Sequence, residues 1–503
     1  MIDLIKTSIK DSFIYSFGNI MLRISGFILL PVYLTQLSPA EYGILGLLEV
    51  TTQVLVQIFS LAMHLPLIRW YWAPEYHNKQ KTIFFSTIMF SSLLAGLMLI
   101  IFLPWASTFA QFLFHDTNYA NLIQLMLVSA SLQIITMIPT TLARVQGKAI
   151  LYTISHILNF IVSLLLTLFF ILKLDMKVEG IYLAQILGYI VNILFLGRFI
   201  WQNSELNFDF TILKEMLNYS FPLALSSMAS VLLTIADRYT LNILGQLSDV
   251  GVYSLGFKIS NTLNVLVISS INLALTPLIY QKMEDPNNKR FYSKIMTYMT
   301  FGIMFFVLGL SLYSQEIVQL FAKDKAYWPA YRLVPILCFA IVFGMLKDLS
   351  TIGLNLKKKT KIIGLIVTII SFINVGLNFL FVSLLKTTGA ALAMLLTQVI
   401  FFFVMFQAAQ KQYRIPYEIQ KIFKMLLLGG FLIGIGFFLF NENEPLIVRI
   451  FSKLFLIILF PIGLYLWNFY EPIEIQTIKG AWRKWRNPLN WKKNRSKIKL
   501  DRK

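Results

Sequence analysis

Long, unbroken apolar runs recur along the whole chain and limit the folds open to it. Each run is about twenty residues long, the length that an α-helix needs to cross the hydrocarbon core of a bilayer. A membrane-spanning β-barrel would show alternating apolar and polar residues instead. Charged residues make up only 14% of the sequence, whereas soluble domains contain roughly 25%. The sequence therefore predicts an all-α polytopic membrane protein.

The apolar runs divide into about fourteen predicted transmembrane helices. They cover residues 12–36, 43–66, 82–105, 120–142, 150–172, 178–201, 217–244, 251–280, 292–313, 329–352, 362–384, 388–410, 421–440 and 446–468. The N-terminus lacks a small-residue cleavage site after a short apolar region, so we expect the first span to direct insertion. The single cysteine, Cys338, excludes a disulfide within the chain.

Lysine and arginine are unevenly divided between the loops, which predicts the orientation. The loops at 37–42, 106–118 and 245–250 contain neither residue. We therefore expect these loops to face outward and both termini to be cytoplasmic.

The segment 471–503 is a basic tail in which Trp482, Trp485 and Trp491 are interleaved with lysines and arginines. Contact with nucleic acid is one interpretation of basic residues mixed with aromatics, but no nucleic-acid-binding motif accompanies them. We expect no nucleic-acid partner and predict instead a helix that lies on the anionic inner leaflet.

The chain contains an internal repeat. Residues 34–47 read LTQLSPAEYGILGL, and residues 244–255 read LGQLSDVGVYSL. The Gln-Leu-Ser triplets match at an offset of 210, whereas Gly43 matches Gly251 at an offset of 208. Each copy is followed by an apolar helix that ends in Pro-Leu-Ile. Such a repeat among hydrophobic spans predicts two membrane lobes with a site between them, as in a transporter.

The polar linker 202–205 separates the predicted lobes. We expect a six-helix N-terminal lobe in 1–205, a six-helix C-terminal lobe in 206–412, two additional helices in 413–470 and the tail beyond. Because each lobe has an even number of spans, both insert in the same sense. Their pseudo-two-fold axis then runs along the membrane normal, and a central cavity is the expected site.

Ionisable side chains deep in predicted spans indicate function, because a charge in the bilayer is costly. Three cations are predicted to bind a phosphate or diphosphate of the substrate: Arg23, Arg238 and Lys258. Arginine makes bidentate phosphate contacts, and lysine acts as a point charge. Three acids are predicted to carry a coupling ion, either a proton or sodium, or to tune the cations: Glu49, Asp237 and Asp348.

A structural role for the same charges is the alternative. Asp237 and Arg238 could form local ion pairs that lock their span to its neighbours, and Glu49 could pair with Lys258.

Four prolines lie within or at the ends of the first two spans of each lobe: Pro31, Pro66, Pro222 and Pro277. Proline removes a backbone hydrogen bond and kinks a helix. We predict that these kinks gate the cavity, and static kinks fixed by packing are the alternative.

Several function classes lack the motifs they require. The sequence contains no phosphate-binding G-x-x-x-x-G-K-[ST] loop, no Cys/His cluster with metal spacing, and no soluble segment long enough for a catalytic domain. We therefore expect neither an enzyme nor a bound cofactor.

Two segments carry a family resemblance. Tyr15, Gly18 and Arg23 followed by 34–47, and residues 217–259 with Asp237-Arg238-Tyr239 and Gly251-Val252-Tyr253, resemble the starts of the two lobes of polysaccharide-biosynthesis flippases. These belong to the multidrug/oligosaccharidyl-lipid/polysaccharide exporter superfamily. The resemblance covers most of 1–410.

The resemblance implies a flippase that moves polyprenyl-diphosphate-linked oligosaccharides across the bacterial inner membrane by alternating access. The glycans would enter O-antigen (lipopolysaccharide), capsule or exopolysaccharide. Its partners would be this lipid-linked oligosaccharide, membrane lipids, a polysaccharide polymerase and glycosyltransferases.

Three alternatives remain at this point. A lipid II flippase and a cation-coupled drug antiporter belong to the same superfamily. A membrane scaffold of a glycan assembly complex, which transports nothing, is a different class, and it should tolerate neutralisation of the buried charges.

Overall fold

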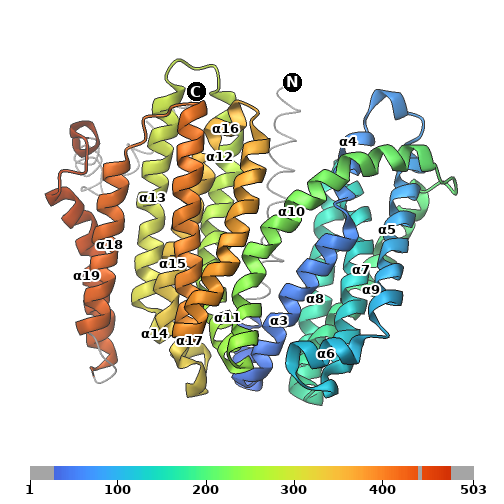
Figure 1. Ribbon diagram of the computed structural model, residues 1–503, viewed down its shortest axis with the longest axis horizontal. Helices are drawn as coiled ribbons and strands as arrows, with labels where there is room; N and C mark the ends of the chain where they lie inside the picture. Colours follow the sequence, from blue (N-terminus) through green and yellow to red (C-terminus); the bar gives the residue numbers. More distant parts are fainter. Residues whose placement is uncertain (1–27, 440–443, 477–503) are drawn as a thin grey trace, which may run out of the picture. The chain divides into compact units, whose positions relative to one another are not determined.

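The computed structural model describes residues 28–439 and 444–476, and these residues form helices joined by short loops, without a β-strand (Figure 1). The shorter helices are α2 (Leu30–Gln36), α4 (His64–Trp70), α6 (Ala106–Phe114), α14 (Ser314–Phe321), α16 (Ile352–Leu356), and the 3-10 segments Pro74–Tyr76, Thr117–Tyr119 and Lys325–Arg332. The longer helices are α3 (Pro39–Ser60), α5 (Gln80–Phe102), α7 (Ala120–Val145), α8 (Ala149–Leu174), α9 (Lys177–Asn203), α10 (Phe210–Leu244), α11 (Leu247–Thr262), α12 (Ser269–Gln281), α13 (Asn288–Leu312), α15 (Leu333–Ser350), α17 (Thr360–Gln412), α18 (Ile419–Leu439) and α19 (Leu446–Leu466).

Eleven helical stretches in the described ranges are long and apolar enough to cross a membrane. One of them, α17, has 53 residues and would be about 80 Å long if straight, far more than the roughly 30 Å core of a bilayer. Lys386 breaks α17 with φ 48° and ψ −125°. A Cβ on Gly389 would lie 1.9 Å from the carbonyl oxygen of Phe381, so the turn requires glycine there. The stretch α17 is therefore two spans, as predicted.

The remaining predicted spans also have counterparts. The span expected at 251–280 is formed by α11, a π-helical segment Leu263–Ile268, and α12. Helix α2 is the described end of the span expected at 12–36. The prediction of an all-α protein with about fourteen transmembrane helices is confirmed.

The described chain packs into two compact units. The larger runs to Asp285 and includes Ser314–Arg414, and the smaller contains Pro286–Tyr313 and the residues from Ile415 onward. Helix α13 thus packs with α18 and α19. This division follows packing, and the division into two symmetric lobes stays a prediction.

Within the larger unit, the two copies of the repeat pack against each other where α3 crosses α11 (Figure 1). A Cβ on Gly43 would lie 1.9 Å from the carbonyl oxygen of Leu247, and a Cβ on Gly251 would lie 1.9 Å from that of Pro39. Only glycine permits so close an approach at either position. The contact is reciprocal, because Leu247 follows Pro39, and Gly251 follows Gly43, by 208 residues.

Both helices also begin with the same capping arrangement. The side chains of Ser38 and Glu41 satisfy each other's backbone N–H groups at the start of α3. Gln246 and Asp249 do the same at the start of α11. These pairs are again separated by 208 residues. The triplet match at 210 is therefore two residues away from the structural equivalence, because the helix starts and the glycine crossing determine which residues correspond.

Candidate functional site

Two cavities adjoin the crossing of α3 and α11 in the larger unit. The crossing cavity, of about 170 Å³, lies between α3, α10 and α11 and is lined by Tyr42, Leu45, Gly46, Glu49, Val50, Gln53, Thr234, Arg238, Ser254, Phe257, Lys258 and Asn261. The α8 cavity, of about 250 Å³, is lined by Leu29, Tyr33, Glu49, Asn159, Phe160, Ser163, Leu164, Thr167, Ile181, Gln185, Tyr189 and Lys258. Glu49 and Lys258 line both, so the cavities share one wall.

Arg238 is a buried cation in the wall of the crossing cavity. Its Nε donates a hydrogen bond of 3.1 Å to the Oγ of Ser254, and its guanidinium lies 4.8 Å from the ring centroid of Phe257. Gly46 makes this possible, because a Cβ there would lie 2.4 Å from the Oγ of Ser254. In the described part of the chain Arg238 forms no ion pair with a carboxylate. Its charge is held in place without being neutralised.

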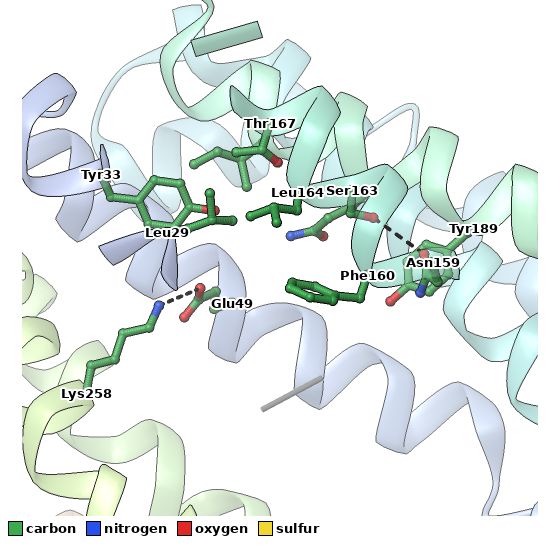
Figure 2. Close-up of a pocket in the computed structure, with 12 residues that line it drawn as sticks. Leu29, Tyr33, Glu49, Asn159, Phe160, Ser163, Leu164, Thr167, Tyr189 and Lys258 are labelled. Carbon is green, nitrogen blue, oxygen red and sulfur yellow. Dashed lines mark hydrogen bonds and ion pairs between the residues drawn. The ribbon is translucent and has the colours of Figure 1, made fainter. Parts of the chain in front are cut away.

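Lys258 reaches the shared wall from α11. Its Nζ lies 3.8 Å from Oε1 of Glu49 on α3 (Figure 2), and the rings of Tyr33 and Tyr42 lie within 6.0 Å. The side chain of Glu49 is 44% exposed and that of Lys258 is 23% exposed. The pair suggested by the sequence is present, but it is long and accessible, so it contributes little to stability.

Asp237 faces away from both cavities although it neighbours Arg238. It is buried and accepts hydrogen bonds from the hydroxyl of Tyr253 on α11 and, at 2.9 Å, from Nδ2 of Asn378 on α17. The carboxylate therefore ties α10 to α11 and α17.

Two of the predicted site residues cannot be assigned to these cavities. Asp348 lines neither cavity, is 55% exposed and pairs with Lys347 at 2.6 Å. Arg23 lies outside the described residues.

The four prolines occupy different helix positions. Pro31 lies in the first turn of α2 and Pro66 in the first turn of α4. Pro222 lies inside α10, and Pro277 lies in α12. Their gating role stays a prediction.

Helix α8 contributes a row of polar side chains to the α8 cavity that was not predicted from the sequence. Asn159, Ser163 and Thr167 follow one another at intervals of four residues and therefore share one face of the helix. Polar residues at this spacing in an otherwise apolar helix were a usable signal.

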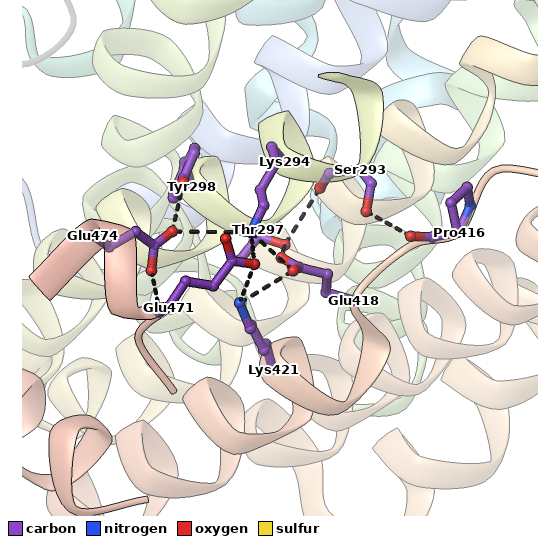
Figure 3. A network of polar contacts seen from close by, with 9 residues as sticks. All are labelled: Ser293, Lys294, Thr297, Tyr298, Pro416, Glu418, Lys421, Glu471 and Glu474. Carbon is purple, nitrogen blue, oxygen red and sulfur yellow. Dashed lines mark hydrogen bonds and ion pairs between the residues drawn. The ribbon is translucent and has the colours of Figure 1, made fainter. Parts of the chain in front are cut away.

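A network of charged groups joins three segments of the smaller unit (Figure 3). Lys294 on α13 donates to Glu418, before α18, at 2.9 Å and to Glu471, after α19, at 2.6 Å. Lys421 pairs with both carboxylates. Among the described residues, no group of three or more His, Cys, Asp or Glu side chains could hold a metal ion.

Sequence comparison shows the family. Residues 8–283, more than half of the chain, match the sequence model of the polysaccharide biosynthesis protein family, and residues 222–380 match that of the MatE family. A search of curated proteins found no match.

Solved structures share the fold at low sequence identity. The lipid II flippase MurJ in an inward closed conformation has a TM-score of 0.68 at 14% identity and covers 92% of this chain and 99% of its own. An inward-facing multidrug resistance MATE family transporter has a TM-score of 0.66 at 14% identity and covers 80% and 97%. A Pyrococcus furiosus transporter of the MOP superfamily, described as having a binding pocket of reverse polarity, has a TM-score of 0.54 at 13% identity and covers 80% and 95%. The chain belongs to the polysaccharide biosynthesis protein family, and it shares its fold with transporters of the MOP superfamily.

Proposed function

We propose that the protein flips a polyprenyl-diphosphate-linked oligosaccharide across the bacterial inner membrane for O-antigen, capsule or exopolysaccharide assembly. The observation that carries the proposal is the pair of cations at two adjoining cavities, Arg238 and Lys258. Arg238 has hydrogen-bond donors left for a bidentate phosphate contact, and Lys258 adds a point charge. Arg23 is the proposed third cation.

The position of Lys258 suggests how cargo and conformation are coupled. A diphosphate that reaches its Nζ competes with Glu49, which belongs to the other copy of the repeat. Binding thus removes one link between α3 and α11 and shifts the population of states in alternating access. The released Glu49 is the proposed carrier of a coupling proton or sodium ion. Net export then requires an ion gradient, a membrane potential or consumption of the product.

The first test follows the glycan in cells that lack the protein. We expect an oligosaccharide on polyprenyl diphosphate to accumulate on the cytoplasmic face. The Arg238→Gln and Lys258→Gln variants should restore export at least about tenfold less well than the wild-type protein, since each loses a charge-assisted phosphate contact. Lys347→Gln is the control, because Lys347 is also a lysine in a predicted span but lines neither cavity. Normal glycan traffic in the deletion strain would refute the proposal.

A lipid II flippase is the second candidate. The likeness to the MurJ structure extends over 92% of this chain, against 80% for the MATE transporter. Accumulation of lipid II, with normal traffic of other glycans, would favour this candidate. Altered sensitivity to cationic compounds would favour the drug antiporter, and unchanged export by both charge variants would favour the scaffold.

A further inference from the structure

The α8 cavity has a lining unlike that of the crossing cavity. Apart from Glu49 and Lys258 at the shared wall, its polar side chains are neutral amides and hydroxyls (Figure 2). Three aromatic rings complete it: Tyr33, Phe160 and Tyr189. Neutral hydrogen-bonding groups next to aromatic faces suit a ligand that has hydroxyls on its rim and C–H groups on its faces.

Two amides in this cavity have unused hydrogen-bonding capacity. Oδ1 of Asn159 accepts from Ser163 at 3.4 Å, and Oε1 of Gln185 accepts from Ser129 at 3.2 Å. Neither amide nitrogen has a partner within residues 28–439 and 444–476. A polar group inside a membrane protein is costly without a partner, so these nitrogens require water or a ligand.

A glycine on the neighbouring helix makes room for this polar row. A Cβ on Gly188 of α9 would lie 2.1 Å from the Oγ of Ser163 and 2.7 Å from Oδ1 of Asn159. The absence of a side chain at Gly188 therefore lets α8 bring its polar face against α9 and positions the amide of Asn159.

The size and position of the cavity limit which ligands it can bind. Its volume of about 250 Å³ is just below the roughly 300–1,000 Å³ of most small-molecule sites, which leaves room for one sugar ring and not for an oligosaccharide. Lys258, a proposed phosphate ligand, stands at its edge. We infer that the α8 cavity binds the sugar ring attached to the diphosphate and that Asn159 and Gln185 determine which sugar is accepted. This inference rests on the proposed function.

The test measures binding to the purified full-length protein in detergent. The probes are short-chain polyprenyl diphosphates that carry glucose, galactose or N-acetylglucosamine, the same lipid diphosphate without sugar, and the free methyl glycosides. We expect the wild type to bind at least one glycosylated lipid about tenfold more tightly than the bare lipid, because hydrogen bonds to the sugar are added. Tenfold corresponds to about 1.4 kcal/mol. The free glycosides should bind at least about a hundredfold more weakly, since they lack the phosphate contacts.

Near-isosteric variants assign the difference to the cavity. Asn159→Leu and Gln185→Met should bind the glycosylated lipids no better than the bare lipid, whose affinity should not change. Asn192→Leu is the matched control, because Asn192 is an amide on the same helix as Gln185 but lines neither cavity. The two variants lie on different helices, so one suffices if the other misfolds, as judged by its thermal midpoint.

The outcomes separate the two proposals. Equal affinity of the wild type for bare and glycosylated lipids would overturn the sugar site and leave the flippase proposal standing. A sugar preference that survives in the folded variants would do the same. Failure of every lipid diphosphate to bind would overturn the flippase proposal, and with it the inference.

Discussion

At the scale of single residues, this protein depends on glycines at contacts where no other side chain fits. Gly43 and Gly251 each face a carbonyl oxygen of the other helix. Their equivalence in the repeat explains why the same residue type recurs at both positions: a symmetric crossing imposes the same steric limit twice.

We predict that Gly43→Ala and Gly251→Ala each lower the free energy of unfolding by at least about 1–3 kcal/mol, because the added methyl group must push the helices apart. Gly96→Ala is the control, since nothing lies within 4 Å of a Cβ there and alanine favours a helix by about 1 kcal/mol. The measurement is the thermal midpoint in detergent. A crossing that tolerated alanine at both positions would contradict the close contact.

At the scale of secondary-structure elements, the charged network around Lys294 connects α13 with the residues that flank α18 and α19. The hydrogen bond from Lys294 is the main reason that the pKa of Glu471 lies below its ordinary value of 4.5. Burial raises the pKa of Glu418, but hydrogen bonds from Lys294 and Thr297 outweigh it and the pKa is lowered.

A carboxyl group whose pKa is lowered by folding stabilises the protein above its unfolded pKa, and this contribution disappears as the pH falls through the folded pKa. We therefore predict that the smaller unit loses stability as the pH falls below 4.5, the ordinary pKa of these glutamates. In Lys294→Met this additional loss should shrink, because the carboxyl pKa values return toward normal. Thermal midpoints at pH 7 and pH 4 would check this. An equal acid-induced drop in both proteins would exclude the network as the cause.

At the scale of the whole molecule, alternating access requires contacts between the two copies of the repeat to open. Gln57 on α3 donates to Ser227 on α10 at 2.7 Å, and Thr51 meets Tyr239 at 2.8 Å. These contacts lie on α3, the helix that also forms the glycine crossing with α11, and they hold α3 to α10 in the described structure.

We predict that cross-linking Gln57→Cys to Ser227→Cys stops transport. The background is Cys338→Ala, which removes the single native thiol, and the reagent is a short bifunctional thiol reagent that can be cleaved by reduction. Export of the lipid-linked glycan should fall with the cross-linked fraction and recover after cleavage. Either cysteine alone is the control. Undiminished export by fully cross-linked protein would show that α3 and α10 stay together throughout the cycle.

The sequence by itself determined the helices, the approximate spans and the repeat, and it supplied the candidate charges, whose roles stay predictions. The length of an apolar run and the glycines and prolines at its ends are local features of the sequence, so they can be recognised without a structure. Only the tertiary structure decided the partner of each charged side chain. Lys258 lies near Glu49, Arg238 donates a hydrogen bond to Ser254, and Asp237 accepts one from Tyr253. The polar row of α8 also became a cavity lining only once Gly188 brought α9 against it. Side-chain direction and the packing of helices distant in sequence depend on many weak contacts at once, and no local pattern records them.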